Sequence, residues 1–139
     1  HLYYLHLALL FAFYLWAIWL AAKQVLFAGV VDVNKIVGAI CIYLLMGMIW
    51  ALMYLFIAQS IPGAFNGIEQ LVWYENFADV AYYSYVTLTT LGYGDISPVA
   101  PVARFLVYME AVVGVFYMAV LVASLIGVGI SESTKNSNP

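Results

Sequence analysis

The stretch VTLTTLGYGDISP at residues 86–98 sets threonines, two glycines and an acid in the middle of a strongly apolar chain. Of the 139 residues, 67% are hydrophobic and 8% are charged, whereas about a quarter of the residues in a typical soluble domain are charged. On either side of the stretch, residues 4–22, 36–58 and 102–130 are each apolar over the roughly 20 residues that a membrane-spanning helix needs. The sequence therefore predicts a multi-pass protein of the cell membrane.

Residues 79–90, with the sequence DVAYYSYVTLTT, lead into the glycines and predict a further, shorter helix. Asp79 is a typical helix-capping residue, and a hydrophobic helix of about a dozen residues is too short to cross a bilayer. Such a helix more commonly enters the membrane and returns on the same side. We therefore predict an all-α membrane protein with three transmembrane helices, one re-entrant helix and a non-helical loop that follows it.

This loop has the sequence TLGYGD at residues 90–95, and we call it the TLGYGD loop. Non-helical backbone at membrane depth leaves carbonyl groups without partners, which costs several kcal/mol each unless they face something polar. Gly92 and Gly94 permit left-handed backbone angles at alternate positions, so successive carbonyls can point to one side. Because one chain supplies only one arc of such a site, we expect a symmetric ring of copies whose carbonyls enclose a dehydrated cation.

The motif TLTTLGYGD resembles the selectivity signature of pore-loop potassium channels of the bacterial type, and the resemblance extends over about residues 36–130. It implies a homotetramer in the plasma membrane that conducts K+ passively through a central pore, with no cofactor besides the permeant ion. It also implies that K+ is bound by the Thr90 hydroxyl and by four backbone carbonyls, those of Thr90, Leu91, Gly92 and Tyr93. Gly94 and Asp95 would close the outer end of the loop.

Two departures from the family pattern change the expected support of the TLGYGD loop. Leu91 stands where valine or isoleucine is more common, and its side chain lacks the β-branch that would pack behind the loop. Val86 stands where some bacterial channels carry a glutamate that hydrogen-bonds the aspartate at the outer end. We expect Tyr82 to hydrogen-bond Asp95 instead.

The third span would form the inner helix of such a channel. A glycine in this helix often acts as a bend in the family, and Gly114 falls at that place. Counted onward at helical spacing, Val115, Met118 and Val122 would face the axis and line an apolar cavity. The alternative is that Gly114 only allows close contact with the re-entrant helix.

Glu110 is the only carboxylate well inside a predicted span, and acids within the membrane are costly and are usually paired or functional. It lies roughly 140° around the helix from Val115 and should therefore face the back of the loop. We predict that it hydrogen-bonds a hydroxyl of the re-entrant helix, with Ser84, Thr87 and Thr89 as candidates, and couples the inner helix to the loop. The alternative is a packing role alone.

The few lysines indicate the orientation of the spans. Lys23 and Lys35 lie in the link between the first two spans and Lys135 follows the third, so the positive-inside rule places these segments in the cytoplasm. The segment after the second span is then outside. There an acidic mouth would concentrate cations, formed by Glu69, Glu75, Asp79 and Asp95.

Composition and motifs also bear on other classes of protein. The net charge of -3 comes without a basic patch for nucleic acid, and the absence of paired catalytic carboxylates, HExxH or a phosphate-binding glycine loop argues against an enzyme. We therefore predict a potassium-selective channel. The alternative is a weakly selective monovalent cation channel, which Tyr93 and Gly94 disfavour. We divide the chain into a preceding span with its cytoplasmic link (1–35), a pore domain (36–130) and a short cytoplasmic tail (131–139), with no room for a soluble regulatory domain.

Overall fold

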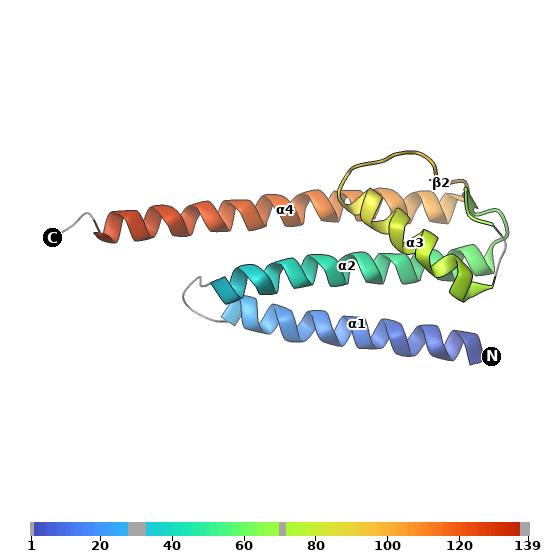
Figure 1. Cartoon of the computed structure of the whole chain (residues 1–139), viewed down its shortest axis with the longest axis horizontal. Helices are drawn as coiled ribbons and strands as arrows, with labels where there is room; N and C mark the ends of the chain where they lie inside the picture. Colours follow the sequence, from blue (N-terminus) through green and yellow to red (C-terminus); the bar gives the residue numbers. More distant parts are fainter. Residues whose placement is uncertain (1, 28–32, 70–71, 137–139) are drawn as a thin grey trace.

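The computed structural model describes residues 2–27, 33–69 and 72–136 (Figure 1). Three of its helices contain apolar segments long enough to cross a membrane, at Leu5–Lys23, Ile36–Ser60 and Pro101–Ser124. The predicted multi-pass, mostly helical fold is therefore confirmed. In chain order, the described elements are α1 (Leu2–Phe27), α2 (Val33–Ser60), β1 (Phe65–Asn66), α3 (Trp73–Leu88), β2 (Ser97–Pro98) and α4 (Pro101–Asn136).

The three long helices lie side by side, with α2 between α1 and α4 (Figure 1). Helix α1 packs against α2, while α3 packs against both α2 and α4. Large apolar side chains stay exposed on α1, such as Phe13 and Trp16 at 57% and 58%, as expected for a helix that faces lipid. Near the end of the same span, the Lys23 ammonium lies 3.7 Å from the centre of the Trp19 ring, so its charge is held at the end of the apolar segment.

Helix α3 begins earlier than the sequence predicted, at Trp73 rather than at Asp79. The residue before it, Val72, has an extended backbone and caps the helix through its carbonyl, which accepts hydrogen bonds from the amides of Glu75 and Asn76 at 3.0 and 3.3 Å. The prediction relied on a side-chain cap, and this cap uses backbone only. Asp79 lies inside the helix and is exposed.

A short antiparallel pairing joins β1 to β2, with Phe65 opposite Pro98 and Asn66 opposite Ser97. The prediction of an all-α fold did not include it. Just after β1, Gly67 has a φ of 83° and lies so close to the Asp95 carbonyl that a side chain would overlap it. The pairing therefore ties the segment after α2 to the outer end of the TLGYGD loop.

The two ends of the helical bundle differ in what they carry. The start of α1, the end of α2, helix α3 and the paired strands lie at one end, while the C-terminal ends of α1 and α4 lie at the other (Figure 1). Toward this second end, the Tyr117 hydroxyl of α4 donates to the Ala39 carbonyl of α2 at 2.6 Å. The arrangement is the one that the predicted topology requires, and which end faces the cytoplasm stays a prediction.

The most buried side chains gather where α2, α3 and α4 meet. Among the large side chains with under 2% exposure are three polar ones, Asn76, Ser84 and Glu110. The Asn76 amide donates to the Glu69 carbonyl at 3.0 Å, which fixes the segment before α3. The position of α3 thus depends on polar contacts within the core as well as on apolar packing.

Candidate functional site

The TLGYGD loop follows directly on α3, which ends at Leu88. Within it, Thr90, Gly92 and Gly94 have φ values of 61°, 58° and 82°, whereas Leu91 and Tyr93 lie outside the positive range. Such alternation turns successive carbonyls to the same side of the chain instead of to opposite sides as in a strand. The backbone therefore has the alternating conformation that the two glycines led us to expect.

Thr90 also has this left-handed conformation, which the sequence did not indicate. A β-branched residue in this region is unusual and costs roughly 1–3 kcal/mol, so surrounding contacts must hold it. The Thr90 amide donates to the Thr87 carbonyl at 2.9 Å, and the Leu91 and Gly92 amides both donate to the Val86 carbonyl at 2.9 and 3.2 Å. The last turn of α3 thereby sets the conformation of the loop.

The carbonyl groups of the loop behave differently from its amides. Across residues 2–27, 33–69 and 72–136, no hydrogen bond of the chain ends on the carbonyl oxygen of Thr90, Leu91, Gly92 or Tyr93. The Leu91 and Tyr93 side chains are 55% and 68% exposed. A single chain thus leaves a row of backbone acceptors for a partner outside itself.

The outer end of the loop is attached to α3 by a side-chain hydrogen bond. The Tyr82 hydroxyl donates to Asp95 Oδ2 at 2.7 Å, as we expected from the sequence. This hydrogen bond holds the pKa of Asp95 below its usual range and raises the pKa of Tyr82. Asp95 therefore keeps a negative charge at the exposed outer end of the loop.

Gly114 lies where α4 touches the C-terminal end of α3. A Cβ atom at this position would lie 2.5 Å from the Leu88 carbonyl oxygen, and the same oxygen accepts a hydrogen bond from the Tyr43 hydroxyl at 3.0 Å. Helix α4 continues through Gly114 without a break. The close contact fits the packing alternative, and a hinge role for Gly114 stays a prediction.

Glu110 is completely buried between three helices. Its Oε1 lies 2.5 Å from the Ser84 hydroxyl of α3, and its Oε2 accepts a hydrogen bond from the Tyr54 hydroxyl of α2. Of the three predicted candidates, Ser84 is therefore the one that contacts Glu110. Thr87 instead bonds with Tyr83, and the Thr89 hydroxyl donates to the Tyr85 carbonyl of its own helix.

The sequence analysis missed Tyr54 as a partner of Glu110. The two residues are 56 positions apart in the chain, and a tyrosine in an apolar span reads equally well as a core residue. Its only signal is the hydroxyl itself, since a buried tyrosine hydroxyl usually has a hydrogen-bond partner.

The three predicted cavity residues share one face of α4, since they follow a helical spacing of three and four residues. Val115, Met118 and Val122 are 53%, 42% and 48% exposed in the single chain. Phe116 and Val120 on the same helix are at least as exposed. These side chains are therefore available to an axis, a neighbouring chain or lipid, and their cavity role stays a prediction.

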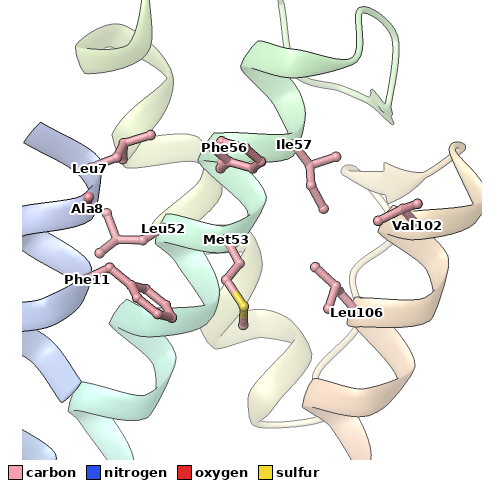
Figure 2. A pocket seen from close by; sticks show the side chains of 9 residues that line it. All are labelled: Leu7, Ala8, Phe11, Leu52, Met53, Phe56, Ile57, Val102 and Leu106. Atoms are coloured by element: carbon pink, nitrogen blue, oxygen red, sulfur yellow. The ribbon is translucent and has the colours of Figure 1, made fainter. Parts of the chain in front are cut away.

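The structure also contains a cavity of about 450 Å3 between α1, α2 and α4 (Figure 2). The side chains that line it contain carbon and one thioether sulfur but no oxygen or nitrogen. It is lined by Leu7, Ala8, Phe11, Leu52, Met53, Phe56, Ile57, Val102 and Leu106. Among the described residues there is also no group of three His, Cys, Asp or Glu side chains that could hold a metal ion.

Comparison with known proteins finds a family and a similar sequence for most of this region. A family model described as an ion channel matches residues 38–130, which include most of α2, all of α3 and the TLGYGD loop, and most of α4. The chain is 36% identical to the inward rectifier potassium channel Kirbac3.1 of Paramagnetospirillum magnetotacticum over 85 residues, or 61% of its own length. It spans only 26% of the length of that relative. No solved structure matches the chain.

Proposed function

Because the chain belongs to the ion channel family that matches residues 38–130, we propose that it forms a potassium-selective channel in which four copies surround a central pore. K+ passes through passively, down its electrochemical gradient. Residues 36–130 form the pore domain, residues 1–35 a preceding span with its cytoplasmic link, and residues 131–139 a cytoplasmic tail.

The backbone of the TLGYGD loop is the observation that carries this proposal. Its alternating left-handed residues and its carbonyl oxygens without partners among the described residues form one arc of a cation site. Four such arcs would replace the hydration shell of a K+ ion with rings of carbonyl oxygens. The Thr90 hydroxyl and the carbonyls of residues 90–93 are the proposed ligands, and Gly94 closes the outer end.

Other residues support the loop or line the pore in this proposal. The hydrogen bond between Tyr82 and Asp95 holds the outer end of the loop, and Glu110 supports α3 from behind. The exposed acids Glu69, Glu75, Asp79 and Asp95 raise the local cation concentration at the mouth. Val115, Met118 and Val122 line an apolar inner cavity.

The alternative within the same family is a weakly selective monovalent cation channel. Potassium selectivity is favoured because the similar Kirbac3.1 protein is described as a potassium channel, and because the loop retains Tyr93 and Gly94 of the potassium-channel signature. Selectivity depends on the number and spacing of the carbonyls around the ion, so the two proposals differ in a property that flux measurements report directly.

Ion flux into vesicles tests the proposal. The purified chain is reconstituted into lipid vesicles, and uptake of K+ is compared with uptake of Na+ under matched gradients, with empty vesicles as the control. We expect uptake of K+ well above that of Na+, and native mass spectrometry should give four copies per particle. Equal uptake of both ions would favour the weakly selective channel, and a monomer without flux would contradict the proposal.

A further inference from the structure

Three contacts between oxygen atoms converge on Glu110 and Ser84. The Tyr54 hydroxyl contacts Glu110 Oε2, the Ser84 hydroxyl lies 2.5 Å from Glu110 Oε1, and the same Ser84 oxygen lies 2.7 Å from the Gly47 carbonyl oxygen. We call these four residues the Glu110 cluster. Two oxygen atoms at such a distance attract each other only when a hydrogen lies between them.

The number of hydrogens available fixes the protonation state that satisfies all three contacts. The hydroxyls of Tyr54 and Ser84 supply one hydrogen each, and the Gly47 carbonyl supplies none. If Glu110 is ionised, Ser84 must donate its hydrogen to the carboxylate. No hydrogen is then left for the contact between the Ser84 oxygen and the Gly47 carbonyl oxygen. If Glu110 is protonated on Oε1, it donates to Ser84, Ser84 donates to Gly47, and Tyr54 donates to Oε2.

We propose that Glu110 is a neutral carboxylic acid whose proton holds α2, α3 and α4 together in the conducting arrangement, which makes it a positioning residue for the TLGYGD loop. This inference rests on the proposed function as a channel. Deprotonation is a single proton transfer: a hydroxide from solvent takes the carboxyl proton and becomes water, and the carboxylate keeps the bonding electron pair.

Among the residues whose side chains the structure describes, none supplies a positive charge to an ionised Glu110. The ionisable side chains that interact with it are Tyr43 and Tyr54 from α2 and Tyr83 from α3, and tyrosine is ordinarily neutral at pH 7. β2 contributes only Ser97 and Pro98 to the packing around α4. A buried carboxylate without a cation nearby is strongly unfavourable, and it would take the Ser84 hydrogen for itself, so loss of the proton would break the contact of Ser84 with the Gly47 carbonyl.

A displacement of Ser84 reaches the loop through the last turns of α3. Ser84 is two residues before Val86, whose carbonyl holds the amides of Leu91 and Gly92. Leu88, one turn after Ser84, is fastened by Tyr43 and lies against Gly114. The proton on Glu110 therefore acts on the cation ligands through the helix that sets their conformation.

Infrared spectroscopy measures this proton directly. The full chain in lipid vesicles at pH 8 should show the C=O stretching band of a protonated carboxylic acid. Exposed acids are ionised at this pH and do not contribute to the band, so the band reports a buried neutral acid. The band should be absent in Glu110→Gln and present in Glu75→Gln, a control at an exposed acid. Ser84→Ala tests the assignment of the band to Glu110 in a second way. Without the Ser84 oxygen, the Glu110 carboxyl loses its hydrogen-bond acceptor, and the frequency of the band should shift. A parent spectrum without the band overturns the inference.

The pH dependence of K+ flux provides the functional test. Flux through the parent should fall as pH rises, by roughly tenfold for the loss of one such buried hydrogen bond. Glu110→Gln should keep its flux at high pH, because the amide donates to Ser84 and accepts from Tyr54 without needing a proton. The same loss of flux in both proteins would overturn the inference.

The two measurements separate this inference from the proposed function. If the parent conducts no K+ at any pH but shows the carboxylic acid band, the channel proposal and with it the role in conduction fail, while the neutral acid stands. If the parent conducts K+ but shows no band, the neutral acid is wrong and the channel proposal stands.

Discussion

The Glu110 cluster and the TLGYGD loop are both polar regions within an apolar chain, but their partners come from different places. In the Glu110 cluster, the carboxyl is completely buried and both of its oxygens have partners from other helices. In the TLGYGD loop, the carbonyls of residues 90–93 have no partner among the described residues, and Tyr93 is 68% exposed. The oxygens of the Glu110 carboxyl have their partners within one chain, whereas the proposed partners of the loop carbonyls are an ion and further copies of the chain.

This difference separates two kinds of effect. A change in the Glu110 cluster removes a partner that the fold depends on, so it should lower the stability of the chain. A change in the TLGYGD loop removes nothing from the core, so it should impair conduction while leaving the fold intact. Four variants, three of them with a matched control, test that separation, beginning with the largest expected effect.

Gly92→Ala should abolish K+ flux while leaving the fold intact. Gly92 has a φ of 58° and open space around it, so the added methyl group meets no neighbour but disfavours the backbone angle by about 1–2 kcal/mol. Turning this residue back would take a carbonyl out of the row of ligands. Flux into vesicles and thermal unfolding in detergent are the two measurements.

Gly63→Ala is the matched control for this variant. Gly63 also has a positive φ, of 72°, with nothing within 4 Å of an added Cβ, so it carries a similar backbone penalty outside the loop. We expect a similar small loss of stability in both variants and normal flux in Gly63→Ala. Equal loss of flux in the two would show that strain alone, rather than the loop carbonyls, explains the result.

Gly114→Ala should lower stability by about 1–3 kcal/mol, because its Cβ would overlap the Leu88 carbonyl at the junction of α3 and α4. On helix propensity alone, the same change would stabilise the helix by roughly 1 kcal/mol. The sign of the shift in unfolding temperature thus decides whether the contact matters. Unchanged stability with an altered single-channel open probability would favour the hinge instead.

Ser84→Ala should lower stability by about 1–2 kcal/mol, because it leaves one oxygen of the buried Glu110 carboxyl without a partner. Ser124→Ala is the control, since Ser124 is exposed on α4 and its hydroxyl donates to the Val120 carbonyl of its own helix. Thermal unfolding of both variants compares the same chemical change in two environments. A loss as large at Ser124 as at Ser84 would contradict the importance of the cluster.

Tyr82→Phe should produce the smallest effect, a change in the response to acid. The hydrogen bond from Tyr82 lowers the pKa of Asp95, so its stabilisation is present above the usual carboxyl pKa and is lost as pH falls through the lowered value. Without the hydroxyl, the acid midpoint for loss of K+ flux should move to higher pH. Tyr74→Phe, at an exposed tyrosine in the first turn of α3, should leave the midpoint unchanged.

The three spans and the presence of the short helix α3 could be predicted because their signals are local. A helix in lipid satisfies its own backbone hydrogen bonds, so an apolar run of sufficient length predicts a span without knowledge of its neighbours. The start of α3 could not be placed this way, because Val72 caps the helix with its backbone carbonyl. Any residue type can supply such a cap, and the sequence therefore carries no mark of it.

The candidate site was predictable in part for the same reason. Gly92 and Gly94 indicate positive φ angles because glycine adopts them without strain. Thr90 also has a positive φ, but only because hydrogen bonds to the end of α3 hold it there. Tyr82 lies in α3 and Asp95 in the loop 13 residues later, and their contact was expected only from the resemblance to the channel family, in which a residue of this helix hydrogen-bonds the aspartate.

By itself, the sequence determined the class of protein, the three spans and the position of the TLGYGD loop, because apolar length and glycine spacing act within a few residues. Only the tertiary structure decided that Tyr54 joins Ser84 at Glu110 and that Gly114 lies against the Leu88 carbonyl. These contacts join residues from separate helices, and their geometry depends on how the helices pack. A buried polar side chain requires a hydrogen-bond partner, but the packing of the helices determines which residue is that partner.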